Sequence, residues 1–103
     1  MSQTDSTVYV LAHIDILPFP PHLDAGQEVL LKFAQDIRNQ AGLTRFELLR
    51  EIPRPNHFQT IAVWDSVEAY EHHLGHPDTL AYRQALHPTL GSPVDDRVHV
   101  LEP

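Results

Sequence analysis

Apolar and polar residues alternate with the two-residue period of a β-strand in several parts of the chain. In the segment 8–16, one face consists of Val8, Val10, Ala12, Ile14 and Ile16. Two further segments, 43–52 and 57–64, flank the turn-forming residues 53–56 and therefore predict an antiparallel hairpin. The first of these strands is expected to place Phe46, Leu48 and Ile52 on one face. A shorter pattern at 96–101 predicts the last strand.

Helical periodicity appears between these strands. A helix that begins between residues 21 and 25 is predicted to bury a stripe formed by Leu23, Leu30, Phe33, Ala34, Ile37 and Ala41. Asp24 and Gln27 have the spacing of a capping box, and Gly42 is expected to end the helix. A second, short helix is expected to begin after Asp65 or Ser66.

The sequence Gly75-His76-Pro77 ends that short helix, because proline suits the first turn of a new helix better than a helix interior. A third helix is therefore expected from Pro77 or Asp78 to about Pro88. The predicted order is β-α-β-β-α(α)-β in one domain over residues 1–103, with residues 1–6 frayed. This order is typical of an α+β, ferredoxin-like fold, in which helices cover one face of a four-stranded antiparallel sheet.

The other face of the first strand, at Tyr9 and Leu11, is too apolar for contact with water. Because the helices cover only one side of such a sheet, this face needs another cover. The sequence therefore predicts a homodimer in which the open faces of two sheets pair.

Composition narrows the function. The 103 residues include 14 Asp and Glu against 7 Lys and Arg, a net charge of -7, which disfavours nucleic-acid binding. Cysteine is absent, which excludes disulfides, metal sites with cysteine ligands and catalysis by a cysteine nucleophile. No signal-peptide pattern is present, and the longest apolar run, Val8 to Ala12, is far too short to cross a membrane. A cytoplasmic protein is expected.

The strand at 57–64 carries the first candidate site residues. One face is formed by Phe58, Thr60, Ala62 and Trp64, so two small side chains lie between large rings. The face fits either an ordinary core around a tryptophan or the floor of a cavity with Trp64 as a wall. Both interpretations are open at this point.

Arg83 is the second candidate, because it shares a helix face with Leu80, Leu86 and Leu90. Burying a guanidinium group without an anion costs several kcal/mol, on the order of 3–5. Arg83 therefore either reaches the rim and pairs with an acid such as Asp78, or anchors an anionic ligand.

Tyr70 and several histidines complete the set of candidates. Tyr70 lies on the side of the short helix that is predicted to face inward. It is interpreted as a core residue whose hydroxyl needs a hydrogen-bond partner. His72, His73 and His76 have spacings that suit a metal, but no third ligand is specifically placed, so titrating surface histidines are the favoured interpretation. His13 and His99 lie on neighbouring strands and are candidates for a buried pair.

Together these residues resemble the antibiotic biosynthesis monooxygenase family, within the dimeric α+β barrel superfamily. The resemblance runs from Val8 to about Val100 and is clearest in Asn56-His57-Phe58, in Trp64-Asp65-Ser66-Val67-Glu68-Ala69-Tyr70 and in Tyr82-Arg83-Gln84-Ala85-Leu86. His73 matches a histidine that is common in the wider family. Thr60 stands where a cofactor-independent branch of the family has asparagine, and a hydroxyl cannot copy the paired donor and acceptor of an amide.

The resemblance implies a cofactor-independent monooxygenase that oxidises a phenolic or quinol small molecule with dioxygen, without flavin or metal. It implies that Trp64 stacks on the substrate, that Arg83 stabilises the phenolate and that Tyr70 and Thr60 orient it. His73 is then the candidate base if it faces the cavity. The expected catalytic residues are Trp64, Tyr70, Arg83 and His73, and the expected substrate contacts are Thr60, Ala62, Phe58 and Leu86.

Three alternatives share the fold. Haem-degrading relatives use an asparagine on the first strand, and the strand from Thr7 to Ile16 has none. A small-molecule isomerase and a non-catalytic dimeric ligand-binding module are the others. Arg83 is the feature that favours an enzyme over a purely structural dimer.

Overall fold

The computed structural model describes residues 6–102, so residues 1–5 of the segment predicted to be frayed lie outside the described part. The strands are β1 (Val8–Asp15), β2 (Leu43–Arg50), β3 (His57–Trp64) and β4 (Asp95–Val100). The helices are α1 (His22–Asp36), α2 (Val67–Leu74) and α3 (Pro77–Leu86). Short 3₁₀ turns follow α1 at Ile37–Asn39 and α3 at His87–Thr89.

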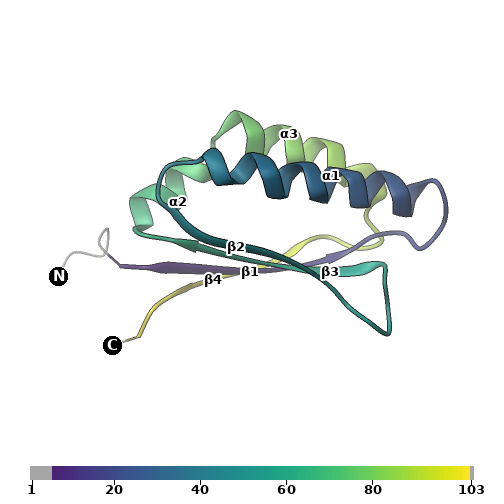
Figure 1. Cartoon of the computed structure of the whole chain (residues 1–103), viewed down its shortest axis with the longest axis horizontal. Coiled ribbons are helices and arrows are strands. Elements are labelled where there is room, and N and C mark those ends of the chain that lie inside the picture. The colour runs from purple at the N-terminus through teal and green to yellow at the C-terminus, as the bar shows by residue number, and fades with distance from the viewer. Residues whose placement is uncertain (1–5, 103) are drawn as a thin grey trace.

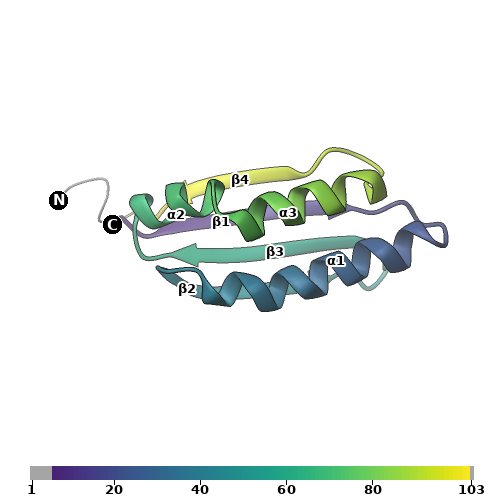
Figure 2. The ribbon, with the colours of Figure 1, turned by 90° about the horizontal axis from the view of Figure 1, so that it is seen from above.

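The four strands form one antiparallel sheet in the order β2-β3-β1-β4. All three helices lie on the same face of this sheet, and the opposite face carries none of them (Figure 1). Seen from above, α1 lies over the β2–β3 side and α3 lies over β1, while α2 covers the end of the sheet where β3 finishes (Figure 2). This arrangement confirms the predicted ferredoxin-like α+β fold.

Local chemistry explains where the helices begin. Ser66 is the N-cap of α2, and its Oγ accepts a hydrogen bond from the backbone N–H of Ala69 at 3.0 Å. His76 caps α3, where its Nδ1 accepts from the N–H of Asp78 at 3.1 Å, and Pro77 is the first helical residue. Both predicted starts are confirmed.

Gly42 lies where the chain turns from the first helix into β2. Its φ is +88°, a left-handed conformation that disfavours other residues, and a Cβ here would lie 2.4 Å from the Cβ of Ala69. The turn therefore requires glycine for both reasons. Helix α1 itself ends earlier than predicted, because its last residues tighten into the 3₁₀ turn at Ile37–Asn39.

Some predicted details were wrong. Helix α1 begins at His22, within the predicted range, but Pro21 occupies its N-cap without a side-chain hydrogen bond, so Asp24 lies in the first turn and forms no capping box. Strand β2 ends at Arg50, which leaves Ile52 95% exposed in the turn and away from Phe46 and Leu48. The last strand begins and ends one residue earlier than predicted.

The apolar core lies between the sheet and the helices in two clusters. One contains Trp64 with Val8, Phe33, Ile37, Phe46 and Ala62. The other contains Phe58 with Ile14, Ile16, Leu30 and Leu86. Tyr82 and Leu48 pack against both clusters, so these two residues join the halves of the core.

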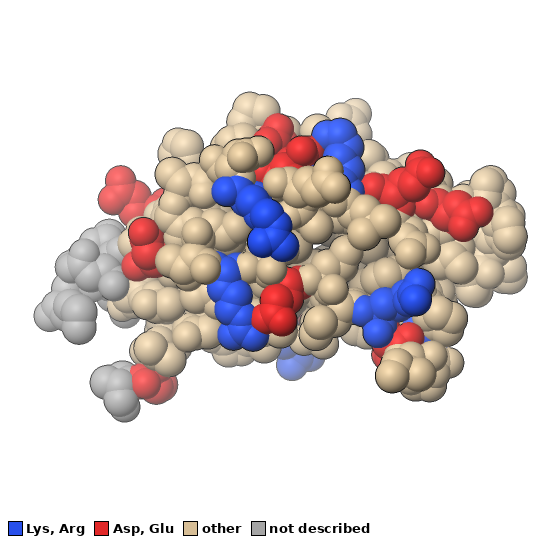
Figure 3. Space-filling view, viewed as in Figure 1, with Lys and Arg blue, Asp and Glu red and all other residues tan. Residues whose placement is uncertain are grey.

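The outer surface carries charges of both signs. On the face shown in Figure 3, basic and acidic side chains are interspersed, and several oppositely charged groups touch. Within residues 6–102, no helix has the length and apolar character needed to span a membrane.

Candidate active site

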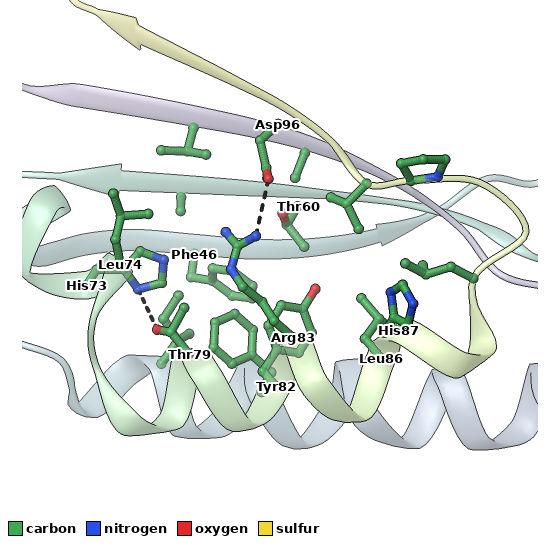
Figure 4. Close-up of a pocket in the computed structure, with 18 of the residues that line it drawn as sticks. Phe46, Thr60, His73, Leu74, Thr79, Tyr82, Arg83, Leu86, His87 and Asp96 are labelled. Atoms are coloured by element: carbon green, nitrogen blue, oxygen red, sulfur yellow. Dashed lines mark hydrogen bonds and ion pairs between the residues drawn. The ribbon is translucent and has the colours of Figure 1, made fainter.

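A cavity of about 510 Å³ lies between the helices and the sheet. On the sheet side its floor includes three small residues, Ala12, Thr60 and Ala62, which leave room that larger side chains would fill. Its other walls come from α1, α2, α3 and the segment that leads into β4 (Figure 4). Of the two interpretations of this face of β3, an ordinary core or the floor of a cavity, the structure shows the floor of a cavity.

The predicted site residues meet in this cavity, with one exception. Its lining includes Thr60, Ala62, Trp64, Tyr70, His73, Arg83 and Leu86. Phe58 does not line it, because this ring is 3% exposed and packs in the second core cluster. The prediction of a substrate contact at Phe58 is therefore corrected to a position in the apolar core.

Trp64 forms the wall at the α2 end. Its side chain has no exposed surface, and its ring centroid lies 4.6 Å from that of His73 at an interplanar angle of 32°. The indole therefore supports the histidine from behind and leaves no free face for stacking on a substrate, unlike the expectation. Its Nε1 is buried without a hydrogen-bond partner among the described residues.

His73 projects from α2 into the cavity and is held by two buried polar side chains. Its Nδ1 lies 2.8 Å from Oε1 of Gln40 and 3.0 Å from Oγ1 of Thr79, and Gln40 Nε2 donates to Thr79 Oγ1 at 3.2 Å. Burial, with smaller contributions from Arg83 and His76, lowers the pKa of His73 to about 4. The imidazole is therefore neutral at physiological pH.

Arg83 crosses the cavity from α3 toward β4, where its Nη1 lies 3.6 Å from Oδ2 of Asp96 (Figure 4). Leu80 is 55% exposed, so the predicted apolar face around Arg83 does not form at that end of the helix. The acidic partner is Asp96 and not Asp78, which lies beside His76. The guanidinium group is half-exposed and adds a positive charge to one side of the cavity.

Two tyrosines add hydroxyl groups. Burial raises the pKa of Tyr70, and more strongly that of Tyr82, so both phenols stay protonated at neutral pH and can donate hydrogen bonds. Tyr82 is stacked on Phe33 with ring centroids 3.8 Å apart and an interplanar angle of 8°. The ring pair joins α1 to α3 across the roof of the cavity.

The remaining histidines occupy separate places. His72 is exposed, His73 faces the cavity and His76 caps α3, so the three do not converge. Among the described residues no group of three or more histidine, aspartate or glutamate side chains is placed to hold a metal ion. His13 pairs with His57 of β3, Nε2 to Nδ1 at 3.0 Å, and not with His99, which lies opposite Tyr9.

Three polar residues at this site were not predicted, namely Gln40, Thr79 and Asp96. Gln40 had a sequence signal, because it continues the buried stripe of Phe33 and Ile37 at helical spacing, where an apolar residue is usual. Thr79 lies seven residues before the buried Leu86 and thus on the same helix face. Asp96 became part of the site only through the position of β4.

Most of the chain matches the model of one protein family. The model of the family described as antibiotic biosynthesis monooxygenase matches residues 7–85. The chain belongs to the antibiotic biosynthesis monooxygenase family. The match covers β1 through most of α3 and includes Trp64, His73 and Arg83. No curated protein sequence matches the chain significantly.

Solved structures support the same fold. A candidate antibiotic biosynthesis monooxygenase from Caulobacter crescentus has a TM-score of 0.85 at 19% identity and covers 98% of this chain and 94% of its own. A protein from Mycobacterium tuberculosis has a TM-score of 0.82 at 24% identity, with 95% of both chains covered. SnoaB, a cofactor-independent oxygenase from Streptomyces nogalater, has a TM-score of 0.79 at 23% identity, again with 95% of both chains covered.

Proposed function

We propose that this protein is a cofactor-independent monooxygenase that oxidises a phenolic or quinol small molecule with dioxygen. The observation that carries the proposal is that a neutral histidine, His73, and an arginine, Arg83, line the same cavity. A base and a fixed cation are the two groups needed to form and hold a phenolate. The family, and the similarity of the fold to that of a cofactor-independent oxygenase, support the same chemistry.

The proposed reaction begins when His73 takes the proton of the substrate hydroxyl. The electron-rich phenolate passes one electron to dioxygen, and the two radicals combine to form a C–O bond at a ring carbon. The imidazolium returns its proton to the peroxide. Loss of water then breaks the O–O bond and removes the C–H hydrogen, which leaves a quinone carbonyl. One oxygen atom enters the product and the other leaves as water.

Each remaining cavity residue has a role in this proposal. Arg83 stabilises the phenolate oxygen, Tyr70 and Thr60 orient the ring by hydrogen bonds, and Ala62 and Leu86 contact it. Trp64 supports His73 from behind. Because Asp96 already neutralises part of the charge of Arg83, we expect a substrate that enters as a neutral phenol and ionises inside the cavity.

The test is oxygen consumption by the purified, chelator-treated protein on a panel of quinols and polycyclic phenols, without flavin. We expect uptake of one dioxygen per substrate oxidised. Arg83→Ala should lower the rate at least about 100-fold while the protein still folds, the scale of losing one group that stabilises an oxyanion. The matched control is Arg54→Ala, which removes an exposed arginine paired with Glu51 outside the cavity.

Four outcomes contradict the proposal. Equal activity in Arg83→Ala and Arg54→Ala would remove Arg83 from the site. A Soret shift on titration with stoichiometric hemin would favour the haem-degrading alternative, and conversion of substrate to an isomer without oxygen uptake would favour the isomerase. Binding without turnover would favour the non-catalytic ligand-binding module.

A cytoplasmic location and a single domain over residues 1–103 stay predictions.

The open face of the sheet supports a second part of the proposal, a homodimer. Strands β1 and β3 present Leu11 opposite Ile61 on this face, both partly exposed, and no described helix covers them. Leu49 on the neighbouring strand is 45% exposed. We propose that a second copy covers this face, since paired sheets would remove these apolar side chains from water.

Light scattering at micromolar concentration tests the dimer. We expect the mass of two chains for the native protein and of one chain for Ile61→Asp, because a carboxylate would be buried at the centre of the interface. Leu80→Asp is the matched control, since Leu80 is an exposed leucine on the helix layer, and this variant should remain a dimer. A monomeric native protein would contradict the sheet-pairing argument.

A further inference from the structure

Gln40 and Thr79 are two buried polar side chains that contact His73 beside the cavity. Gln40 follows the 3₁₀ turn after α1 and is 6% exposed, and Thr79 in α3 is 1% exposed. Burying an amide and a hydroxyl is unfavourable unless their hydrogen bonds are made inside the protein. They make these bonds with each other and with His73, and thereby join three separate segments of the chain at one point.

The directions of these bonds follow from the donors and acceptors. Gln40 donates its Nε2–H to Thr79 Oγ1, so its Oε1, which can only accept, is the atom that faces His73 Nδ1 at 2.8 Å. Nδ1 must then carry the proton of the neutral ring. Thr79 Oγ1, 3.0 Å away, lies near enough to share the same N–H.

The other ring nitrogen is left free. In Figure 4 the dashed bond joins one nitrogen of His73 to Thr79, and the second nitrogen points to the opposite side, toward the cavity. Nε2 has no hydrogen-bond partner among residues 6–102. A neutral imidazole with a proton on Nδ1 has its lone pair on Nε2, so the ring presents an acceptor to whatever occupies the cavity.

We propose that Gln40 and Thr79 are positioning residues that hold His73 as the Nδ1–H tautomer, so that Nε2 is the atom that takes the hydroxyl proton of the substrate. The inference rests on the proposed function, because it assigns an atom to the base in that reaction. It also adds a role after proton transfer, because the imidazolium carries a proton on both nitrogens. Gln40 Oε1 then accepts from the charged Nδ1–H and stabilises it, as a charge-assisted hydrogen bond does.

The groups around His73 agree with this role. Arg83 and His76 are the charged or titratable groups that lower its pKa, and the rings of Trp64, Phe33 and Tyr70 surround it. Burial contributes most to the shift, which keeps the ring neutral at pH 7. A neutral ring exists as one tautomer or the other, and the amide of Gln40 selects between them.

The direct test is the tautomer itself, read from long-range proton–nitrogen correlation spectra of the ¹⁵N-labelled native protein at neutral pH. We expect a protonated Nδ1 and a bare Nε2 on His73. A protonated Nε2 would overturn the inference. This measurement needs no substrate and no variant, so it remains decisive even if no compound in the panel is oxidised, an outcome that would count only against the proposed function.

Variants then connect the tautomer to the reaction. Gln40→Met keeps the length of the side chain and removes the acceptor, and Thr79→Val removes the hydroxyl at nearly constant shape. We expect the Nε2–H tautomer to become populated in Gln40→Met and kcat to fall about tenfold in each variant, with KM little changed. Thr79→Ser keeps the hydroxyl and should therefore keep the native tautomer and the native kcat.

The matched control is Thr89→Val. Thr89 is also a buried threonine, 4% exposed, and its Oγ1 donates to the carbonyl of Leu86 at 2.7 Å, away from His73. This variant loses one buried hydrogen bond but should keep the native tautomer and kcat. If Thr79→Val and Thr89→Val affect kcat equally, or if Gln40→Met leaves both the tautomer and kcat unchanged, Gln40 and Thr79 are structural residues only.

Discussion

The two faces of the sheet are made from the same strands, but the helices cover only one of them. On the face under the helices, Ile14 of β1 is completely buried and small residues leave a cavity. On the other face, Ile61 of β3 is only partly covered. Because successive side chains of a strand point to opposite faces, a shift of one residue in the pairing would exchange the two surfaces. The alternation in the sequence thus decides which residues can become a site.

The histidines show the same difference. His73, on the covered side, is held by an amide and a hydroxyl, which carry no charge. His57, on the open side, has its Nδ1 3.0 Å from His13 Nε2, and its own Nε2 lies 3.6 Å from a carboxylate oxygen of Asp15. A low-dielectric site penalises charge, so neutral partners suit a base that must stay uncharged until the substrate arrives.

The largest expected effect compares one substitution on the two faces. Ile14→Ala removes a fully buried side chain and should lower the free energy of unfolding by about 2–5 kcal/mol, because a cavity is left behind. Ile61→Ala should lower it by about 1 kcal/mol in the monomer, because its side chain is already partly in water. Urea unfolding of both variants gives the two values.

The same pair of variants sharpens the comparison if a second copy covers the open face. The unfolding midpoint then depends on protein concentration, and the loss in Ile61→Ala approaches that in Ile14→Ala as the concentration rises. Equal losses at every concentration would instead mean that the two faces are equally buried within one chain.

A smaller effect should appear with pH. The folded state holds the pKa of His73 at about 4, below its ordinary value of 6.5, so the unfolded chain binds the proton more readily between these values. Burial of the neutral His73 ring therefore costs the protein no stability above pH 6.5. As the pH falls from 6.5 toward 4, the free energy of unfolding decreases, because only the unfolded chain takes up the proton. Since the ring is partly solvated, we expect a loss of about 1–2 kcal/mol.

This loss is measured as the difference in pH dependence between the native protein and His73→Gln in urea unfolding from pH 7 to pH 4. The variant lacks the titrating ring, so its stability should fall less steeply, whatever its stability at pH 7. Parallel curves for the two proteins would mean that the cavity does not keep His73 neutral.

The smallest effect concerns the open-face pair. His13→Ala removes the hydrogen bond to His57, and we expect a loss of about 0.5–1.5 kcal/mol in the free energy of unfolding, the usual worth of one such bond. Oxygen uptake should not change, because the pair lies on the side of the sheet away from the cavity. A loss of activity comparable to that of Arg83→Ala would contradict the separation of the two faces.

Much of the local structure could be predicted, because it depends on residues close together in the chain. The alternation of apolar and polar residues predicted β1 and β3, and it placed Thr60, Ala62 and Trp64 on one face of β3. Ser66 and Pro77 predicted where α2 and α3 begin. Helix-face patterns singled out Tyr70 and Arg83, the resemblance gave roles to these residues and to His73, and all three line the same cavity. Such signals need no knowledge of how the helices pack.

Partners far apart in the sequence were decided only by the tertiary structure. The contact between His73 and Gln40 spans 33 residues, and that between His13 and His57 spans 44. Arg83 meets Asp96 because α3 lies over β1 and β4 is the neighbour of β1 in the sheet. The position of a side chain along a helix or strand says which face it occupies, but not which residue packs against it. The sequence alone therefore determined the fold and the kind of residues in the site, while helix packing decided the hydrogen bonds of His73 and the acidic partner of Arg83.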